Sequence, residues 1–277
     1  MVNPVVDAAP LYLAEQEGIF AEHGLDVELS VGQGGSAVAA ALQSRSADLG
    51  IVNLVTLFSG RANNLPLAVA TPISISSSEE AGLYAASDSG ITNLSQVKGK
   101  RFGIVGSGSV AELATAAALD EVNLSPGDIE KVQVPLPNLI SAATSGQVDF
   151  IFVNSPLTLQ AEDAGLVRIH DAFTGVTHDL PSAAIAASER WLDQHAGTRD
   201  AFQQALAEAV DLANSNEQKV RKVLPTYTGL DEEQASRVAV PDYVADLSHA
   251  EVQRVPDLMM QYGLLTDPAD AAAAVAW

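Results

Sequence analysis

The sequence predicts an α/β fold built from two similar halves, each a mixed, mostly parallel sheet flanked by helices. Three observations predict it. Residues 27–53 read as a strand, a glycine-rich loop, a helix and a second strand, about the length of a parallel crossover. The six residues Asp48–Asn53, DLGIVN, recur as Asp149–Asn154, DFIFVN, which favours internal duplication. Between the halves, Pro72–Glu80 is a serine-rich connector without periodicity.

The composition excludes several classes of protein and of site. A chain of 277 residues can form two ordinary domains or one large one, and a hydrophobic content of 47% excludes disorder. No apolar run approaches the roughly 20 residues that span a bilayer. The absence of cysteine excludes disulfides, cysteine-based zinc sites and thiol nucleophiles.

The chain is strongly acidic. Fourteen basic and 35 acidic residues give a formal charge of −21, spread along the chain. Such a charge repels nucleic acid and anionic lipid, and it is typical of an acidic, well-solvated surface. No signal peptide follows Met1, so we expect either a cytoplasmic protein or the mature form of an exported one.

In the first half, a helix is predicted over Pro10–Phe20 and a strand over Val27–Val31, where apolar and polar residues alternate. Ser36 stands where a helix N-cap belongs, after the glycines. Because Ala39 provides no reciprocal cap, the N–H groups of this first turn stay open to water or to an anionic group. A plain cap and a ligand contact both remain open. Further predicted elements are the strand Leu49–Val52, a helix from Leu54 and the strand Leu67–Thr71.

The second half repeats this order of elements. Its predicted strands are Leu83–Ala86, Phe102–Val105, Val132–Val134, Val148–Val153 and Val167–Ile169, and its predicted helices are Val110–Val122, Leu139–Thr144 and one from Pro156. The apolar run Ala183–Ala187 predicts a strand returning to the first half. The remaining C-terminal helices carry apolar stripes, and we expect them to pack without taking part in chemistry.

No catalytic constellation is present in the sequence. The five histidines lack metal-type spacing, and no G-x-S-x-G motif occurs. The turn Gly106–Ala111 matches G-x-G-x-x-A, which allows a tight turn, a small-ligand site or a dinucleotide site. Pro135 stands where the ribose-binding acid of a dinucleotide site belongs. Ser109 and Glu112 have the spacing of a capping box, and Ser155 with Pro156 marks a further helix start.

Several segments together resemble the solute-binding proteins of ABC importers, in the subgroup that binds sulfonates, taurine, nitrate and thiamine precursors. They are Asp7–Ala14, Gly18–Phe20, Gly24–Glu28, Gly34–Ser36, Ala47–Gly50, Ser89–Ile91, Leu94–Lys100, Gly106–Ser109, Gly146–Asp149 and Ala161–Gly165. The resemblance covers roughly residues 5–190. It implies a two-lobed periplasmic-binding-protein fold of type II. Lobe 1 would hold residues 1–75 and 184–277, lobe 2 residues 76–183, with two hinge crossings between them.

The resemblance also implies a function. The protein would capture a small polar or anionic organic molecule, such as a sulfonate, an amino-sulfonate or a heterocyclic or aromatic acid, by hinge closure and deliver it to a permease. We expect a monomer without enzyme activity, cofactor or metal, located in the periplasm or outside the cell in association with the membrane. A lipid anchor could have been removed from the sequence. One alternative is an enzyme of pyrimidine or thiamine-precursor metabolism, whose cysteine-rich iron-binding stretch is absent here. The other is a sensor ligand-binding domain, which would need fused signalling segments.

The ligand-binding residues are carried over from the resemblance, position by position. They are Asp7, Ala8, Pro10, Gly34, Gly35, Ser36, Asn53, Thr56, Ser74, Ser76, Ser107, Gly108, Ser109, Asn154 and Ser155. No Arg or Lys falls among them, which disfavours nitrate and multiply charged anions. Asp7 could pair with an amino group or a heterocyclic N–H, or it could cap the helix at Pro10. The usual first strand is reduced to Met1–Asn3.

Overall fold

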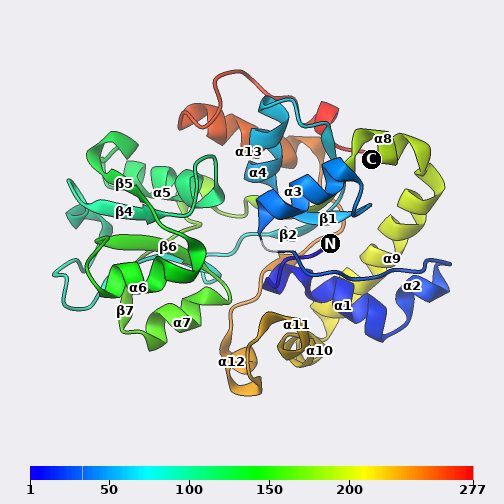
Figure 1. Ribbon diagram of the computed structural model, residues 1–277, viewed down its shortest axis with the longest axis horizontal. Coiled ribbons are helices and arrows are strands. Elements are labelled where there is room, and N and C mark those ends of the chain that lie inside the picture. The colour runs from blue at the N-terminus through cyan, green and yellow to red at the C-terminus, as the bar shows by residue number, and fades with distance from the viewer. Residues whose placement is uncertain (33, 277) are drawn as a thin grey trace. The chain divides into compact units, whose positions relative to one another are not determined.

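The computed structural model describes residues 1–32 and 34–276, apart from the side chain of Ser36, and divides into two compact units (Figure 1). Unit 1 consists of Met1–Ile75, Pro181–Arg237 and the chain from Pro241 onward; unit 2 consists of Ser76–Leu180 and Val238–Val240. The second boundary thus lies at 180/181 rather than at the expected 183/184, because a strand of unit 1 already begins at Pro181. Val238–Val240 belong to unit 2, whereas the sequence prediction assigned the whole of residues 184–277 to lobe 1.

The sheet of unit 1 has the strand order β1-β8-β2-β9. Its strands are β1 (Gly50–Asn53), β8 (Pro181–Ser188), β2 (Leu67–Ile75) and β9 (Asp242–Tyr243). All three neighbouring pairs are antiparallel. The expectation of a mostly parallel sheet is therefore wrong in this unit, because the returning strand β8 lies between β1 and β2, which share one direction.

Strand β2 extends into the segment that was predicted to be a connector. All of its residues up to Ser74 are buried, and Pro72 and Ser74 pair with Ala184 and Ala183 of β8. The register shifts between Pro72 and Ser74. Such an irregularity tolerates a proline, which cannot donate to the ladder. The connector prediction is thus wrong for residues 72–75.

The predicted strand Val27–Val31 does not form. Only Val31 makes a ladder contact, an isolated parallel bridge to Val2. The alternation of burial is nevertheless present, since Leu25, Val27 and Leu29 are half-buried and the residues between them are exposed. The side-chain pattern was interpreted correctly, but a strand also needs a backbone partner, and among the described residues only Val2 supplies one.

Helices cover the sheet of unit 1 on both sides (Figure 1). Helices α3, α4 and α13 lie on one side and α1 and α9 on the other. The predicted helix Pro10–Phe20 is divided at Gly18, whose φ of 80° ends the helical path. The helices of unit 1 are α1 (Ala9–Gln16), α2 (Ile19–Glu22), α3 (Gly35–Ser44), α4 (Leu54–Ala62), α8 (Glu189–Gln194), α9 (Ala196–Ser215), α10 (Glu217–Val223), α11 (Pro225–Thr228), α12 (Glu232–Arg237) and α13 (His249–Gln261).

Unit 2 is a three-layer α/β sandwich. Its strand order is β5-β4-β6-β3-β7, with β4 parallel to β5 and β6, and β3 antiparallel to β6 and β7. Phe150 and Phe152 pack on the α5 side, whereas Ile151 and Val153 pack on the side of α6 and α7. The elements are β3 (Ala81–Ala86), β4 (Arg101–Ile104), α5 (Val110–Glu121), β5 (Glu130–Gln133), α6 (Leu139–Thr144), β6 (Phe150–Asn154), α7 (Leu157–Asp163) and β7 (Leu166–Asp171).

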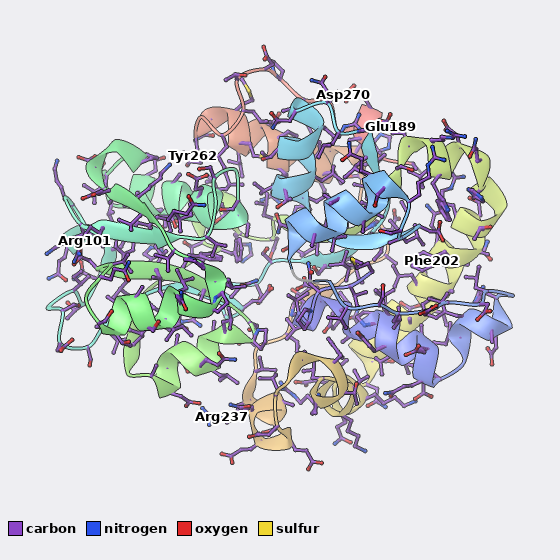
Figure 2. All side chains as sticks on the ribbon, in the orientation of Figure 1. Arg101, Glu189, Phe202, Arg237, Tyr262 and Asp270 are labelled. Atoms are coloured by element: carbon purple, nitrogen blue, oxygen red, sulfur yellow. The ribbon has the colours of Figure 1, made fainter. Side chains whose placement is uncertain are left out.

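The two acids of the repeated motif have different partners. The Asp149 carboxylate accepts bonds from the Arg101 backbone N–H at 2.7 Å and from its guanidinium at 2.9 and 3.0 Å (Figure 2 labels Arg101). These bonds join the start of β4 to the start of β6, and the Arg101 guanidinium is the main cause that lowers the pKa of Asp149. Asp48 instead lies near the Met1 amino group: burial lowers the pKa of that group, and the attraction of Asp48 opposes this only in part.

We expect Asp149→Ala to lower the free energy of unfolding at pH 7 by about 1–2 kcal/mol, the range for charged hydrogen bonds after allowance for partial exposure. Because the pKa of Asp149 is lowered, the carboxylate stabilises the native state above its ordinary pKa of 3.8, and this contribution is lost as the pH falls through the lowered pKa. Urea unfolding at pH 7 and pH 3 measures the difference. Asp88→Ala, at an exposed position, is the control; an equal loss in both variants would contradict the prediction.

Candidate functional site

In unit 2, polar residues gather at the carboxyl ends of the adjacent parallel strands β4 and β6. The chain leaves β4 through Ser107–Ser109 and leaves β6 at Asn154–Ser155. The hydroxyl oxygens of Ser109 and Ser155 are buried and have no hydrogen-bond partner among the described residues. The hydroxyl of Ser76, where the chain enters unit 2, is likewise buried and has no hydrogen-bond partner among the described residues. A buried hydroxyl without a partner is costly, so groups of this kind commonly mark a site that a ligand or water completes.

The predicted capping box of α5 does not form. Ser109 is the N-cap residue, but its side chain makes no cap bond. The Glu112 carboxylate accepts instead from the Gly108 backbone N–H at 2.5 Å and from the Lys131 ammonium at 2.7 Å. Glu112 is therefore occupied elsewhere, and the Ser109 hydroxyl is left free at the start of a 12-residue helix.

In unit 1, β8 aligns two of the predicted residues. Ala183 pairs with Asn53 at the end of β1 and with Ser74 near the end of β2. Asn53 acts as the N-cap of α4, since its side-chain oxygen accepts from the Val55 N–H at 2.9 Å. Its local role is thus structural. Asn154, at the matching position of unit 2, is half-buried, and its side chain has no hydrogen bond to another described residue.

The glycine turn before α3 differs from the sequence prediction. Helix α3 begins at Gly35, and its N-cap is Gly34, whose φ of 100° suits glycine. Ser36 is therefore not the N-cap, and its side chain is outside the described part of the structure. The Gly34 N–H donates to Asn3 Oδ1 at 3.0 Å, and a Cβ on Gly35 would lie 3.5 Å from Thr56 Cγ2. The turn and Thr56 are thus neighbours within unit 1.

The depth of α3 on the sheet is fixed by Gly50 in β1. A Cβ at this position would overlap the side chain of Val38 in α3. Because the strand carries no side chain here, the helix backbone approaches the sheet closely. The position of the Gly34–Gly35 turn therefore depends on the glycine of the repeated motif.

Asp7 is a buried carboxyl group, with 5% of its surface exposed. Ser74 Oγ donates a hydrogen bond to its Oδ1. Burial raises the pKa of Asp7 above its ordinary value of 3.8, and the Ser74 bond only partly opposes this. Asp7 does not cap the helix at Pro10, because the N-cap of α1 is Ala8 and no side chain caps it.

Tyr227 lies near Asp7 and near two further tyrosines, Tyr12 and Tyr243, and sequence reasoning missed all three. The rings of Tyr12 and Tyr227 stack with centroids 3.9 Å apart and an interplanar angle of 5°. The Tyr227 hydroxyl is buried without a partner among the described residues, and burial, with Tyr243, Asp7 and Tyr12 nearby, holds its pKa well above 10.0. The Tyr243 hydroxyl donates to the Val6 carbonyl at 2.9 Å. Tyr227 and Tyr243 belong to the C-terminal region, where we expected only packing.

The remaining predicted residues belong to both units. Ala8 and Pro10 are buried in unit 1, and Ser107 is exposed in unit 2. Across the described residues, no group of three or more acids and histidines could hold a metal ion. None of the described helices is both long and apolar enough to cross a membrane.

The architecture is that of a known fold. The chain superposes on the alkanesulfonate-binding protein SsuA from Xanthomonas axonopodis pv. citri, bound to MOPS, with a TM-score of 0.84 and 22% sequence identity. The match covers 99% of this chain and 96% of that one. The predicted α/β periplasmic-binding-protein fold, with sheets flanked by helices, is therefore confirmed, and the sheet of unit 2 is the mixed one.

Sequence comparison identifies the family. The NMT1/THI5-like family model matches residues 5–219, and the chain belongs to that family. "Putative binding protein YtlA" of Bacillus subtilis is 26% identical over 203 residues, 73% of this chain and 61% of YtlA. The 4-amino-5-hydroxymethyl-2-methylpyrimidine phosphate synthase of Schizosaccharomyces pombe is 26% identical over 140 residues, 50% of this chain and 39% of the synthase. The chain thus spans less than two thirds of the length of these relatives.

The two asparagines of the repeated motif should behave differently. We expect Asn53→Ala to lower the free energy of unfolding by about 1 kcal/mol, the usual cost of losing an N-cap side chain. Asn154→Ala is the matched control, because its side chain caps no helix and makes no bond to a described residue. Urea unfolding measures both, and an equal loss would contradict the assigned roles.

Asp7 should make stability depend on pH. Because its pKa is raised, the native state holds this proton more tightly than the unfolded chain does. Its contribution to the free energy of unfolding therefore falls as the pH rises from about 4 through the raised pKa. We expect Asp7→Asn to gain stability relative to wild type between pH 4 and pH 7 in urea unfolding. The exposed Asp246→Asn is the control; a constant difference for Asp7→Asn would disprove the assignment.

Proposed function

We propose that this chain is the solute-binding protein of an ABC importer. Membership of the NMT1/THI5-like family supports this, as does the likeness to SsuA, whose name states an alkanesulfonate-binding role. The similarity to YtlA, which is named as a binding protein, points the same way. We propose an extracytoplasmic location and a permease partner on the same grounds.

The observation that carries the proposal lies in unit 2. The buried, unpartnered hydroxyls of Ser109 and Ser155 stand at the carboxyl ends of two adjacent parallel strands. Ligands of open α/β sheets bind outside these ends. Ser109 also precedes the first turn of α5, where backbone N–H groups and the helix dipole favour a partial negative charge. The edge is suited to the oxygen atoms of a polar or singly anionic group.

Unit 1 adds a second set of polar groups. The Asp7 carboxyl and the Tyr227 hydroxyl lie in one buried cluster, with no Arg or Lys among the causes that shift their pKa values. A carboxyl in such surroundings favours a partner that donates a hydrogen bond, such as an amino group or a heterocyclic N–H. We propose that the unit 2 edge binds a small organic solute with an acidic or strongly accepting group, and that Asp7 in unit 1 suits an N–H donor. Amino-sulfonates and heterocyclic acids are the leading candidates.

Enzyme activity is the second candidate function. The synthase from Schizosaccharomyces pombe favours it, because it matches half of this chain. A synthase would change its substrate covalently, whereas a binding protein releases the solute unchanged. The experiment below separates these outcomes by recovering the solute after incubation.

Thermal melting with a panel of solutes tests the proposal. The panel contains sulfonates, amino-sulfonates, aromatic acids and pyrimidines, each added to purified protein. A solute at about 100 times its Kd should add roughly 2.7 kcal/mol of stability, and mass spectrometry should recover it unchanged. If no compound shifts the melt while one is converted to product, the binding proposal is wrong.

Two variants locate the site. Ser109→Ala and Ser155→Ala should each weaken binding of the active solute by about 2- to 10-fold, the effect of one neutral hydrogen bond. The control is Thr115→Val, which removes a hydroxyl that is also buried and unpartnered but lies inside α5, away from the strand ends. Calorimetry measures the three affinities. Equal effects of all three variants would exclude the proposed edge as the binding site.

A further inference from the structure

Two arginine side chains of unit 1 have no partner within the described part of the chain. The protein has 14 basic residues and 35 acidic ones, and at least nine of the basic side chains form an ion pair with a carboxylate. The guanidinium groups of Arg45 and Arg190 form neither an ion pair nor a hydrogen bond with another described residue. In a chain this acidic, they are exceptions.

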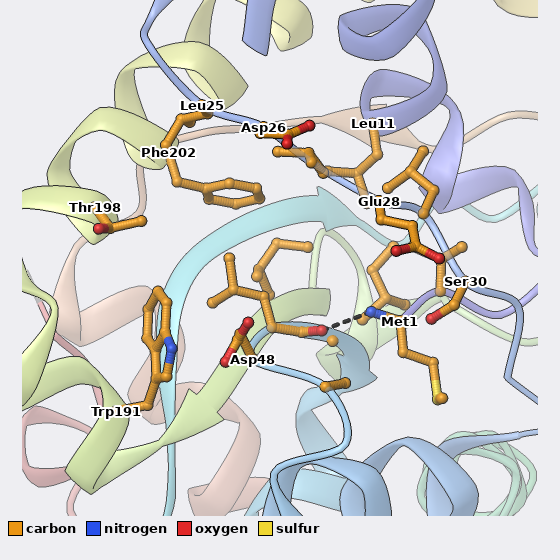
Figure 3. Close-up of a pocket in the computed structure, with 18 of the residues that line it drawn as sticks. Met1, Leu11, Leu25, Asp26, Glu28, Ser30, Asp48, Trp191, Thr198 and Phe202 are labelled. Carbon is orange, nitrogen blue, oxygen red and sulfur yellow. Dashed lines mark hydrogen bonds between the residues drawn. The ribbon is translucent and has the colours of Figure 1, made fainter. Parts of the chain in front are cut away.

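Both arginines line one pocket of about 180 Å³ within unit 1, which we call the α3–α8 pocket. Arg45 follows the last turn of α3, and Arg190 lies in α8, which begins where β8 ends. Trp191 and Asp48 also line it, and both are labelled in Figure 3, where they border a larger neighbouring pocket. Asp48 is the single acidic residue of the lining, so the arginines outnumber the acids.

The Arg45 side chain is not used to complete the end of α3. The Ala41 carbonyl accepts hydrogen bonds from the Ser46 N–H at 3.0 Å and from the Ser44 hydroxyl at 3.3 Å. The Leu42 carbonyl accepts from the Arg45 N–H at 3.4 Å. These bonds occupy two of the last carbonyls of the helix, which a basic side chain could otherwise cap. The Arg45 guanidinium is thus available to the pocket.

An aromatic pair forms part of the wall of the α3–α8 pocket. The ring of His195 stacks on that of Trp191, with centroids 4.9 Å apart and an interplanar angle of 21°. His195 Nδ1 lies 3.0 Å from the Trp191 carbonyl oxygen, and because a carbonyl only accepts, Nδ1 carries the proton of this bond. The side-chain amide of Gln194, also in the lining, has no hydrogen bond to another described residue. The wall therefore combines a held aromatic face with an available N–H donor.

These groups suit a tetrahedral oxyanion. A guanidinium is a planar fork that binds two oxygen atoms of a carboxylate or a phosphate. One arginine already engages both oxygens of a carboxylate, so two arginines from different elements are fully used only by a group with more oxygens, such as phosphate or sulfate. The volume of about 180 Å³ is below the roughly 300–1,000 Å³ of pockets for larger organic ligands. It suits such a group, free or in a small ester.

We propose that the α3–α8 pocket is a second binding site, which holds a phosphate or sulfate group of a small molecule between Arg45 and Arg190. A membrane surface would meet the whole formal charge of −21, whereas a small ion meets mainly the charges within a Debye length of about 8 Å. A small molecule is therefore the source of the group. Along β8, Ser188 lies about 16 Å from Ala183, the level of the expected ligand-binding residues of unit 1. An occupied α3–α8 pocket thus leaves those residues open.

The fluorescence of Trp191 tests the proposal, because Trp277→Phe leaves it as the only tryptophan of the chain. Inorganic phosphate and sulfate, at an ionic strength held constant with NaCl, should each change this fluorescence to saturation, whereas acetate should not. Arg45→Gln and Arg190→Gln should each raise the apparent Kd for phosphate about 10-fold or more, the effect of charge-assisted hydrogen bonds, without changing Tm. The control is Lys222→Gln, which removes an exposed cation of α10 that also has no partner among the described residues.

Four results would overturn the proposal. A response that does not saturate, or that acetate reproduces, would show that the pocket holds no tetrahedral oxyanion. Equal weakening by Lys222→Gln would assign the effect to net charge alone. A response kept in both arginine variants but lost in Ser109→Ala would place the anion at the proposed solute site of unit 2. Binding to phosphatidylglycerol vesicles but not to phosphatidylcholine vesicles, lost in both arginine variants, would make a lipid headgroup the source of the phosphate.

Discussion

The antiparallel pairing of β8 with both β1 and β2 is the constraint that sets the positions of Asn53, Ser74 and Asp7 in unit 1. Ala183 on β8 holds Asn53 and Ser74 at one level, two strands apart. Ser74 in turn donates to Asp7, which brings the start of α1 to the same level. A slip of one residue in this ladder would turn Ser74 to the opposite face of the sheet and leave the Asp7 carboxyl without its donor.

Much of the fold follows from local sequence, and the failures have physical causes. The repeated motif correctly predicted β1 and β6, because short apolar runs bounded by turn residues are typical of buried strands. The strand expected at Val27–Val31 failed because pairing depends on distant backbone that a local pattern does not reveal. Pro72 concealed the continuation of β2, since only the register shift opposite β8 allows a proline there.

The candidate site was partly predictable for the same reason. Turns that follow strands can be located from sequence, and this marked Ser109 and Ser155 as helix starts; the family resemblance then placed both among the expected ligand-binding residues. Tyr227 was missed because it reaches Asp7 from more than 200 residues along the chain, within a region whose pattern indicates only packing. The capping box at Ser109 was expected from spacing alone, whereas Lys131 and the Gly108 N–H compete for the Glu112 carboxylate. Unsatisfied buried groups at such points are typical of sites that serve a function rather than stability.

The missing side chain at Gly50 also limits how this protein could be re-engineered. A Cβ there would overlap the Val38 side chain, so Val38 or α3 would have to shift. Gly103 is similarly enclosed in unit 2, where a Cβ would lie 3.0 Å from the side chains of Ile151 and Val148. A mutant library meant to alter the proposed solute specificity should therefore keep Gly50 and Gly103 and vary serines such as Ser109 and Ser155. The absence of side chains at the two glycines lets the neighbouring elements pack closely against the strands.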